Sequence, residues 1–224
     1  MSGLRKGCFF GQPKTVEGIE GMTYITNRLK GNELEDYLSS LMYEYDDEVV
    51  YATFDLRGEW VTDSNTPTSL AIEKYVAELL VLPHTHYNRT TRPIKELTKI
   101  EKKAIVAIYD ITQQLLSTKK VSHVVVYRGL SWSKRPDWVK DGLEVGQLIR
   151  FEEQRILSSW SFSQEIAQGF VHDKSFGFVL RAHMPIDRIF AIIDIPIESE
   201  SVCISYDNTE EFEGVFINGG HQYE

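Results

Sequence analysis

The sequence predicts an α+β fold in which a helical part comes first and a β-rich part follows. Up to about residue 120, apolar residues recur at the three- and four-residue spacing of helices. After that point, short apolar runs bounded by Gly, Pro, Asp or Asn indicate strands. No Pro/Gly/Ser-rich linker divides the chain. We therefore expect a helical part over residues 1–120 and a β-rich core over 121–224, both within one domain.

Each expected element has a local signal. Helical spacing covers three N-terminal segments, residues 33–45, 70–82 and 97–116. Pro83 and Pro93 separate them, and Thr98 with Glu101 fits a capping box at the start of the third. The expected strands are residues 121–128, 147–152, 175–181, 188–194, 201–205 and 214–218. A short helix over 163–172, with Ile166, Ala167 and Phe170 inward, interrupts them.

Composition narrows the function classes. The chain of 224 residues carries a net charge of −9, which disfavours broad binding to nucleic acid phosphates. Cys8 and Cys203 have no nearby Cys or His partner, so neither a zinc site nor a disulfide framework is expected. The start of the chain lacks the pattern of a secretion signal, and no apolar run is long enough to span a bilayer. We expect a soluble, cytoplasmic protein that binds neither metal nor membrane.

The first polar signal ends the strand expected over 121–128. Tyr127, Arg128 and Gly129 follow three valines, so a guanidinium lies at the end of a strongly apolar segment. An arginine binds phosphate or carboxylate by a two-pronged contact, and a glycine beside it allows close approach of a ligand or another backbone. The alternative is a surface arginine at a strand end, which is the commoner situation for an arginine taken alone.

The second signal is a run of alternating serines that opens the expected C-terminal helix. Hydroxyls at alternate positions of an extended segment share one face. Ser163 is well placed as the helix N-cap, whereas Ser159 and Ser161 have no such local explanation.

The third signal is the acidic pair Glu211 and Glu213, with Phe212 between them, just before the last expected strand. In an extended segment the two carboxylates point to the same side, about 7 Å apart, with Phe212 opposite. Carboxylate pairs serve glycosyl transfer, where one stabilises an oxocarbenium ion and the other manages a proton. The alternative is a solvated acidic turn.

In this order the three signals resemble the R-S-E family of mono-ADP-ribosyltransferases, and most closely its phage Mod and Alt members. Tyr127-Arg128-Gly129 matches the aromatic-Arg-Gly motif, Ser161-Phe162-Ser163 matches the Ser-Thr-Ser motif, and Glu211-Phe212-Glu213 matches Glu-x-Glu. The resemblance covers residues 121–224. Phe162 departs from the small middle residue of the family motif, so the register Ser159-Trp160-Ser161 stays open.

The resemblance implies a split β-sandwich that encloses an NAD cleft. NAD would be a substrate and no metal would be needed. Arg128 would hold an NAD phosphate, and the Gly129 backbone would lie near the nicotinamide. Ser161 would support the strand and hydrogen-bond the catalytic Glu213, and Ser161, Ser163 and Glu213 would all contribute to NAD binding.

Glu213 would also accept a hydrogen bond from the 2′-hydroxyl of the nicotinamide ribose and so stabilise the charge that develops as nicotinamide leaves. Glu211 would orient the acceptor and take its proton. A glutamate at this position in the family accompanies arginine acceptors, so the expected partner is an arginine of a target protein. Tyr206 is a further candidate contact for the acceptor.

Other functions stay open. The same fold could serve an NAD glycohydrolase or a transferase that acts on nucleic acid, and six basic residues near the third helix could meet such a partner: Arg89, Arg92, Lys95, Lys99, Lys102 and Lys103. A solvated helix face explains them as well. A non-catalytic interaction module of the same fold is another alternative. A metalloenzyme based on His84 and His86 is the weakest, because no third ligand is evident.

Overall fold

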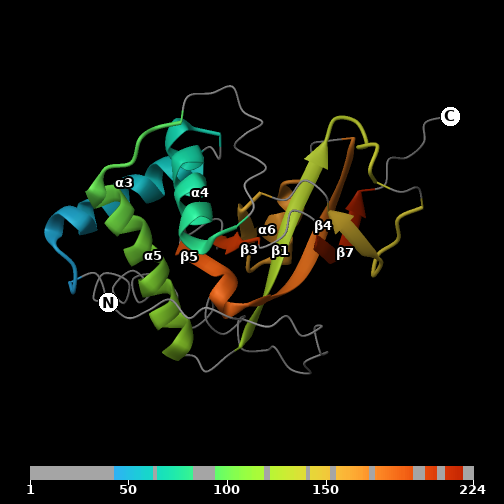
Figure 1. Cartoon of the computed structure of the whole chain (residues 1–224). Coiled ribbons are helices and arrows are strands. Elements are labelled where there is room, and N and C mark those ends of the chain that lie inside the picture. Colours follow the sequence, from blue (N-terminus) through green and yellow to red (C-terminus); the bar gives the residue numbers. More distant parts are fainter. Residues whose placement is uncertain are drawn as a thin grey trace.

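The computed structural model describes residues 43–62, 65–82, 94–118, 122–139, 142–151, 155–171, 175–193, 200–205 and 210–218. Within these segments it is a mixed structure of helices and one antiparallel sheet, as the α+β expectation requires. Three of the described helices come first in the chain and lie to one side of the sheet (Figure 1). They are α3 (Asp47–Thr62), α4 (Pro67–Leu80) and α5 (Lys99–Thr118).

Local capping explains where these helices begin and end. Thr66 caps α4 by accepting a hydrogen bond from the Ser69 N–H, and Pro67 occupies the first helical position, where no N–H is needed. Val81 ends the same helix with a left-handed backbone, φ 57°. The capping box expected for α5 is confirmed: the Thr98 N–H donates to Glu101 and the Glu101 N–H donates to Thr98 Oγ1.

Helix α3 was not expected from the sequence. Its buried residues Val49, Thr53 and Leu56 follow helical spacing, but Tyr51 and Phe54 are exposed on the other side. Apolar residues on both sides blur the period on which the prediction depends. Most of the helix expected over 33–45 lies outside the described residues, and residues 43–45 form a turn before α3.

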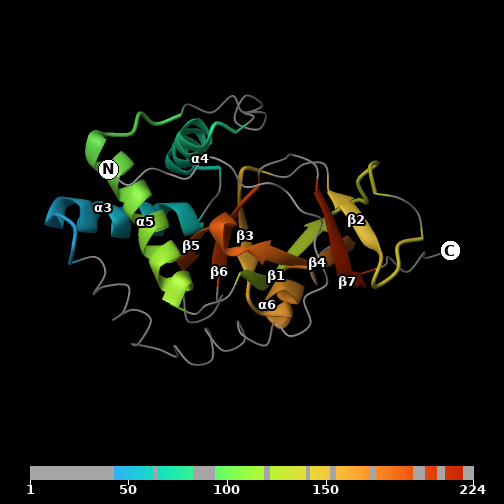
Figure 2. The ribbon, with the colours of Figure 1, turned by 60° about the horizontal axis from the view of Figure 1, so that its bottom comes forward.

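Seven described strands form the sheet, in the order β2-β7-β4-β1-β3-β6-β5, and every neighbouring pair is antiparallel. Their bounds are β1 (His123–Trp132), β2 (Leu148–Phe151), β3 (Leu157–Ser161), β4 (Phe176–Pro185), β5 (Ile189–Ile193), β6 (Glu200–Ile204) and β7 (Glu210–Asn218). A 3-10 turn, η2 (Ile186–Arg188), joins β4 to β5. The β5 edge lies beside α5, and β2 and β7 form the end of the sheet far from α3, α4 and α5 (Figure 2).

The sheet is strongly curved. Strands β1 and β4 separate Trp160 on β3 from Phe212 on β7, which in a flat sheet would place the two residues about 14 Å apart. Their ring centroids are only 5.0 Å apart. We call the face that carries these two rings the concave face and the other the convex face.

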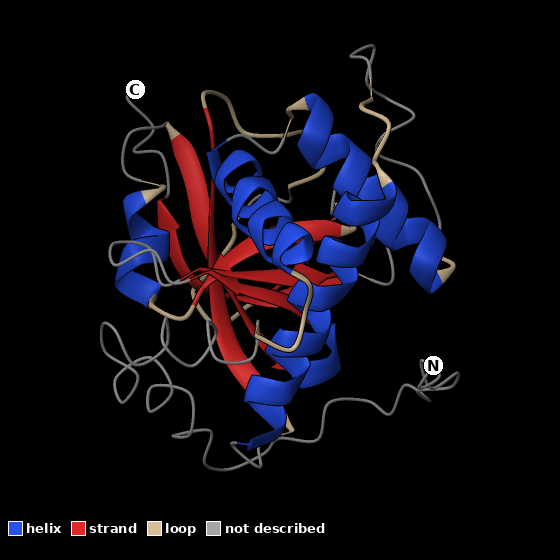
Figure 3. Ribbon diagram, turned by 90° about the vertical axis from the view of Figure 1, so that its left-hand side faces the viewer, coloured by secondary structure: helices blue, strands red, loops and turns tan. Residues whose placement is uncertain are grey.

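Helices and sheet share their cores. One cluster fills the concave face with Val126, Phe178 and Leu180 among others. A second cluster packs α3, α4 and the first half of α5 against β3, β5 and β6. The second half of α5 contributes Ile111 and Leu115 to the first cluster, so α5 passes from one core to the other. Figure 3 shows the helices stacked in front of the sheet when the molecule is viewed from the helical side.

Candidate functional site

The arginine of the first motif lies inside a strand. The sequence indicated that the strand ends at Arg128, but β1 continues to Trp132 because β4 supplies paired residues along its whole length, from Pro185 to Phe176. Its neighbours fix the direction of the side chain. Arg128 lies opposite Leu180 of β4, and both belong to the concave face.

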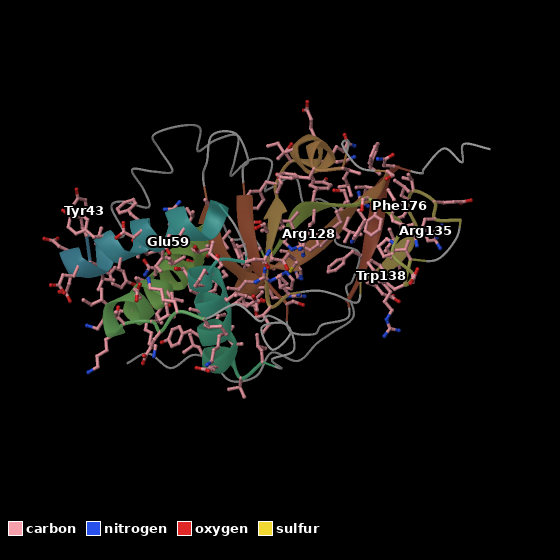
Figure 4. The ribbon with its side chains drawn as sticks, turned by 90° about the horizontal axis from the view of Figure 1, so that it is seen from above. Tyr43, Glu59, Arg128, Arg135, Trp138 and Phe176 are labelled. Carbon is pink, nitrogen blue, oxygen red and sulfur yellow. The ribbon has the colours of Figure 1, made fainter. Side chains whose placement is uncertain are left out.

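Arg128 (labelled in Figure 4) is half-buried as a residue, and its guanidinium Nη1 is buried. The guanidinium lies over the ring of Trp160, 5.9 Å from the ring centroid. Burial lowers the pKa of Arg128 to about 10, the positive charge of Arg155 lowers it as well, and Cys203 acts in the opposite direction. Arg128 is still a cation at neutral pH. The Arg128 guanidinium is thus next to an aromatic ring, partly removed from water and within range of the positive charge of Arg155.

Gly129 permits the close approach of a helix. It lies on the convex face, where α6 (Gln164–Gly169) packs against β1. A Cβ atom at position 129 would lie 2.0 Å from the Ala167 carbonyl oxygen, which no side chain tolerates. Hence the space in front of Gly129 is filled by α6. The close approach expected from the sequence is present, with a helix backbone as the neighbour.

The serine motif joins β3 to α6. Ser161 is the last residue of β3, only 6 % exposed, and its Oγ accepts a hydrogen bond from the Ser163 N–H at 3.0 Å. Ser163 Oγ accepts from the Ile166 N–H, which confirms Ser163 as the N-cap of α6. Ser159 is exposed two residues earlier on the same face as Ser161.

The helix that follows is shorter than expected. It ends at Gly169, and Phe170 is its C-cap. Ala167 is buried as expected, but Phe170 is 57 % exposed, so the expectation that it points inward was wrong. Beyond the last helical residue a side chain no longer follows the helical stripe, which explains the difference.

The acidic motif lies near the start of β7. Phe212 points into the concave core against Trp160, whereas Glu211 and Glu213 share the convex face. Glu213 is ion-paired with Arg181 of β4, whose Nε and Nη2 both donate to Glu213 Oε2, Nε at 3.0 Å. Glu211 is exposed and lies opposite Arg150 of β2.

Cross-strand register aligns four polar residues on the convex face. Glu213, Arg181, Tyr127 and Ser161 face one another in turn on β7, β4, β1 and β3. His183 lies on the same face two residues from Arg181. Burial and Arg181 lower the pKa of His183, while Glu213 raises it. Sequence reasoning missed Arg181 and His183, although a charged residue at the end of the apolar run 176–180 was a signal.

The structure therefore brings some of the expected residues together and separates others. Glu211, Glu213 and Ser161 share the convex face, but β4 and β1 stand between Glu213 and Ser161. Arg128 follows Tyr127 in the strand, so its side chain points to the opposite, concave face. Because side chains alternate along a strand, this single step decides which face each motif serves.

A second arginine, also missed by sequence reasoning, is close enough for its charge to lower the pKa of Arg128. Arg155 precedes β3 and makes a two-pronged contact with Glu73 of α4, with its Nε 3.1 Å from Oε2. The other oxygen of Glu73 accepts the Ile156 N–H at 3.0 Å, and Glu73 is only 2 % exposed. This carboxylate ties the helical part to the strand that carries the serine motif.

A cavity of about 460 Å³ lies away from the three motifs, between α3 and the start of α5. Its lining includes Asp55, Glu59, Glu101 and Lys95, and Lys95 is paired with Glu101 at 2.7 Å (Figure 4 labels Glu59). Carboxylates therefore surround Lys95. Lys102 lies over the ring of Tyr75, and Lys99 and Lys103 are exposed.

Several candidate residues fall outside the described segments: Tyr206, His84, His86, Arg89, Arg92, Pro83, Pro93 and Cys8. Among the residues that the structure does describe, no group of three or more His, Cys, Asp or Glu is arranged to hold a metal ion. None of the described helices is both long and apolar enough to cross a bilayer. Comparison of the chain with family models, curated proteins and solved structures found no match.

Proposed function

We propose that the protein is a mono-ADP-ribosyltransferase that cleaves NAD, releases nicotinamide and moves ADP-ribose to an arginine of a target protein. The observation that carries the proposal is the ordered set of three motifs, aromatic-Arg-Gly, Ser-x-Ser and Glu-x-Glu. Arg128 lies on β1, Ser161 on β3 and Glu213 on β7 of one curved sheet, and the serine motif leads directly into a capped helix.

Each motif has a role in the proposed reaction. The partly buried side chain of Arg128 binds an NAD phosphate, a contact that partial desolvation strengthens. Glu213 accepts a hydrogen bond from the ribose 2′-hydroxyl and stabilises the positive charge that develops as nicotinamide leaves. Glu211 takes the proton of the incoming guanidine. Ser161 and Ser163 hold the β3–α6 corner in shape.

The proposed reaction requires Glu213 and Arg128 on the same face, and a β-bulge beside Glu213 offers the route. Val179 pairs with Phe216 and Leu180 pairs with Gly214, so Val215 has no opposite residue. Glu213 now lies opposite Arg181. If the bulge moved along β7 to the N-terminal side of Glu213, Glu213 would instead lie opposite Ala182, whose side chain faces the concave core. A one-residue shift moves a strand's side chains to the other face, and bulges are frequent beside active sites. We therefore include this shift in the proposal.

The decisive experiment is incubation of the full chain with NAD labelled in its adenylate part, followed by measurement of released nicotinamide and of label on macromolecules. We expect nicotinamide release by the wild type and its loss in Glu213→Gln, with label in a cell lysate that protease removes and nuclease leaves in place. The matched control is Glu165→Gln, an exposed glutamate of α6 that is not part of the three motifs.

The same experiment separates the alternatives. Release of nicotinamide without labelled macromolecules identifies a glycohydrolase. Label that nuclease removes identifies a nucleic acid acceptor. No nicotinamide release under any condition contradicts the proposal and leaves a non-catalytic module.

A further inference from the structure

Hydrogen-bond donors gather on the concave face around Trp160. The ring of Trp160 is 2 % exposed, and the guanidinium of Arg128 lies over it at 5.9 Å. The indole Nε1–H of Trp160 is buried and has no hydrogen-bond acceptor among the described residues. A buried donor without an acceptor is rare and costly in folded proteins, so such a group points to a molecule or ion that supplies the acceptor.

A second cation adjoins this place. Arg155 is close enough for its charge to act on Arg128, and the two guanidinium groups repel each other. Arg155 is not a solvated side chain that can swing away. Glu73, which is almost fully buried on α4, holds it by a two-pronged contact.

Two guanidinium groups and one indole N–H therefore lie near one another. Glu73, the carboxylate that binds Arg155, also accepts the Ile156 N–H. Guanidinium groups that converge in this way attract an anion. An oxyanion with several acceptor oxygens would accept from both guanidinium groups and from the indole N–H together.

We propose that Arg128, Arg155 and the Trp160 indole N–H form a binding subsite for a phosphate or diphosphate group, and that Glu73 is the positioning residue for Arg155. Where this identifies the anion as the diphosphate of NAD, it rests on the proposed function. Its new content is the part played by Arg155, Trp160 and Glu73, to which the three sequence motifs assign no role.

The test is a titration of the full chain with inorganic pyrophosphate, followed by NMR of 15N-labelled indole groups. The chain has four tryptophans. The signal missing in Trp160→Phe belongs to Trp160, and we expect it to move downfield and saturate as its N–H gains an acceptor. Arg155→Ala should bind pyrophosphate about tenfold or more weakly, since a charge-assisted contact is lost. Arg155→Lys keeps the charge and should recover part of the affinity.

Two further variants complete the test. Glu73→Gln removes the charge that orients Arg155 while keeping an acceptor for the Ile156 N–H. It should weaken pyrophosphate binding several-fold, and with NAD it should raise KM while kcat stays near that of the wild type. Lys134→Ala is the matched control, because Lys134 is an exposed cation near the end of β1, and it should bind pyrophosphate as the wild type does.

The outcomes separate this inference from the proposed function. An unmoved Trp160 signal at saturating pyrophosphate, or equal affinity in Arg155→Ala and the wild type, overturns the subsite even if nicotinamide is released from NAD. Saturable binding that depends on Arg155 and Trp160 supports the subsite even if no nicotinamide is released, and only the identification with NAD is then lost.

Discussion

Glu213 carries the central step of the proposed reaction, and in the structure its carboxylate is occupied by Arg181. The two side chains are about one-third exposed, so water competes with the pair and its net contribution to stability is small. Its consequence is chemical: Glu213 must exchange Arg181 for the ribose hydroxyl before it can act. Glu211, exposed and two residues away, carries no such constraint.

The two glutamates should therefore respond differently to the same substitution. Glu213→Gln removes the charge that stabilises the transition state and should lower both NAD cleavage and transfer by about a hundredfold or more. Glu211→Gln should spare most NAD hydrolysis while transfer to arginine falls. Nicotinamide release and label transfer, measured in parallel, check the division. Equal loss of both activities in the two variants contradicts it.

At the scale of elements, the approach of α6 to β1 decides the shape of the convex face. Gly129 allows the Ala167 carbonyl to lie where a Cβ atom would stand. Ser161 and Ser163 set the corner from which α6 departs. The position of α6 therefore depends on three residues of the sequence motifs, whatever they bind.

We expect Gly129→Ala to destabilise the fold by about 2 kcal/mol or more, because the new methyl group can be accommodated only if the backbone of β1 or α6 moves. The free energy of unfolding in urea measures the effect. Gly58→Ala, in α3, is the matched control. Its Cβ meets nothing within 4 Å, so it should stabilise the helix by about 0.5–1 kcal/mol. A Gly129→Ala protein as stable as the wild type would show that the helix does not pack as closely as described.

The position of the bulge at Val215 decides which face of the sheet Glu213 occupies. If NAD binding moves the bulge to the N-terminal side of Glu213, Phe212 leaves the concave core and turns outward. The thiol of Phe212→Cys should then resist alkylation in the free protein and react when NAD is in excess. Mass mapping of the alkylated peptides gives the rate, and Cys203, buried on β6, is the internal control. A thiol equally protected with and without NAD contradicts the shift.

At the scale of the whole molecule, the helical and β-rich parts are joined by a shared core and by the buried contact of Glu73 with Arg155. The contact links residues 82 positions apart in the chain. Glu73 satisfies both a guanidinium and a backbone N–H, so its loss would leave two donors without their acceptor.

Glu73→Ala should therefore lower the free energy of unfolding by about 3 kcal/mol, since removing one partner of a buried ion pair leaves the other uncompensated. Urea unfolding followed by circular dichroism measures it. Glu78→Ala is the control, because Glu78 lies on the same helix, is exposed and makes only a 3.9 Å surface contact with Lys74 within the described part of the chain. A loss below about 1 kcal/mol in Glu73→Ala would show that the contact does not join the two parts.

Much of the fold follows from local chemistry that the sequence shows directly. The capping box at Thr98, the N-cap at Ser163 and the apolar stripes of α4 and α5 each depend on residues within a turn or two of one another. The alternation that separates Phe212 from its neighbouring glutamates is equally local. Helix α3 was not predicted because its apolar residues lie on more than one side of the helix. Strand β1 continues beyond Arg128 because β4 provides hydrogen-bonding partners, which the local sequence pattern does not reveal.

Arg128, Glu211 and Glu213 show most clearly which features the sequence determines and which the tertiary structure determines. By itself, the sequence determined the presence and order of the three motifs and the strands and helix that carry them. Only the tertiary structure decided that Arg128 faces the concave core beside Trp160 and Arg155, while Glu213 pairs with Arg181 on the other face. The reason is register: a shift of one residue between paired strands reverses the face of every side chain, and register is set by distant strands and by the bulge at Val215.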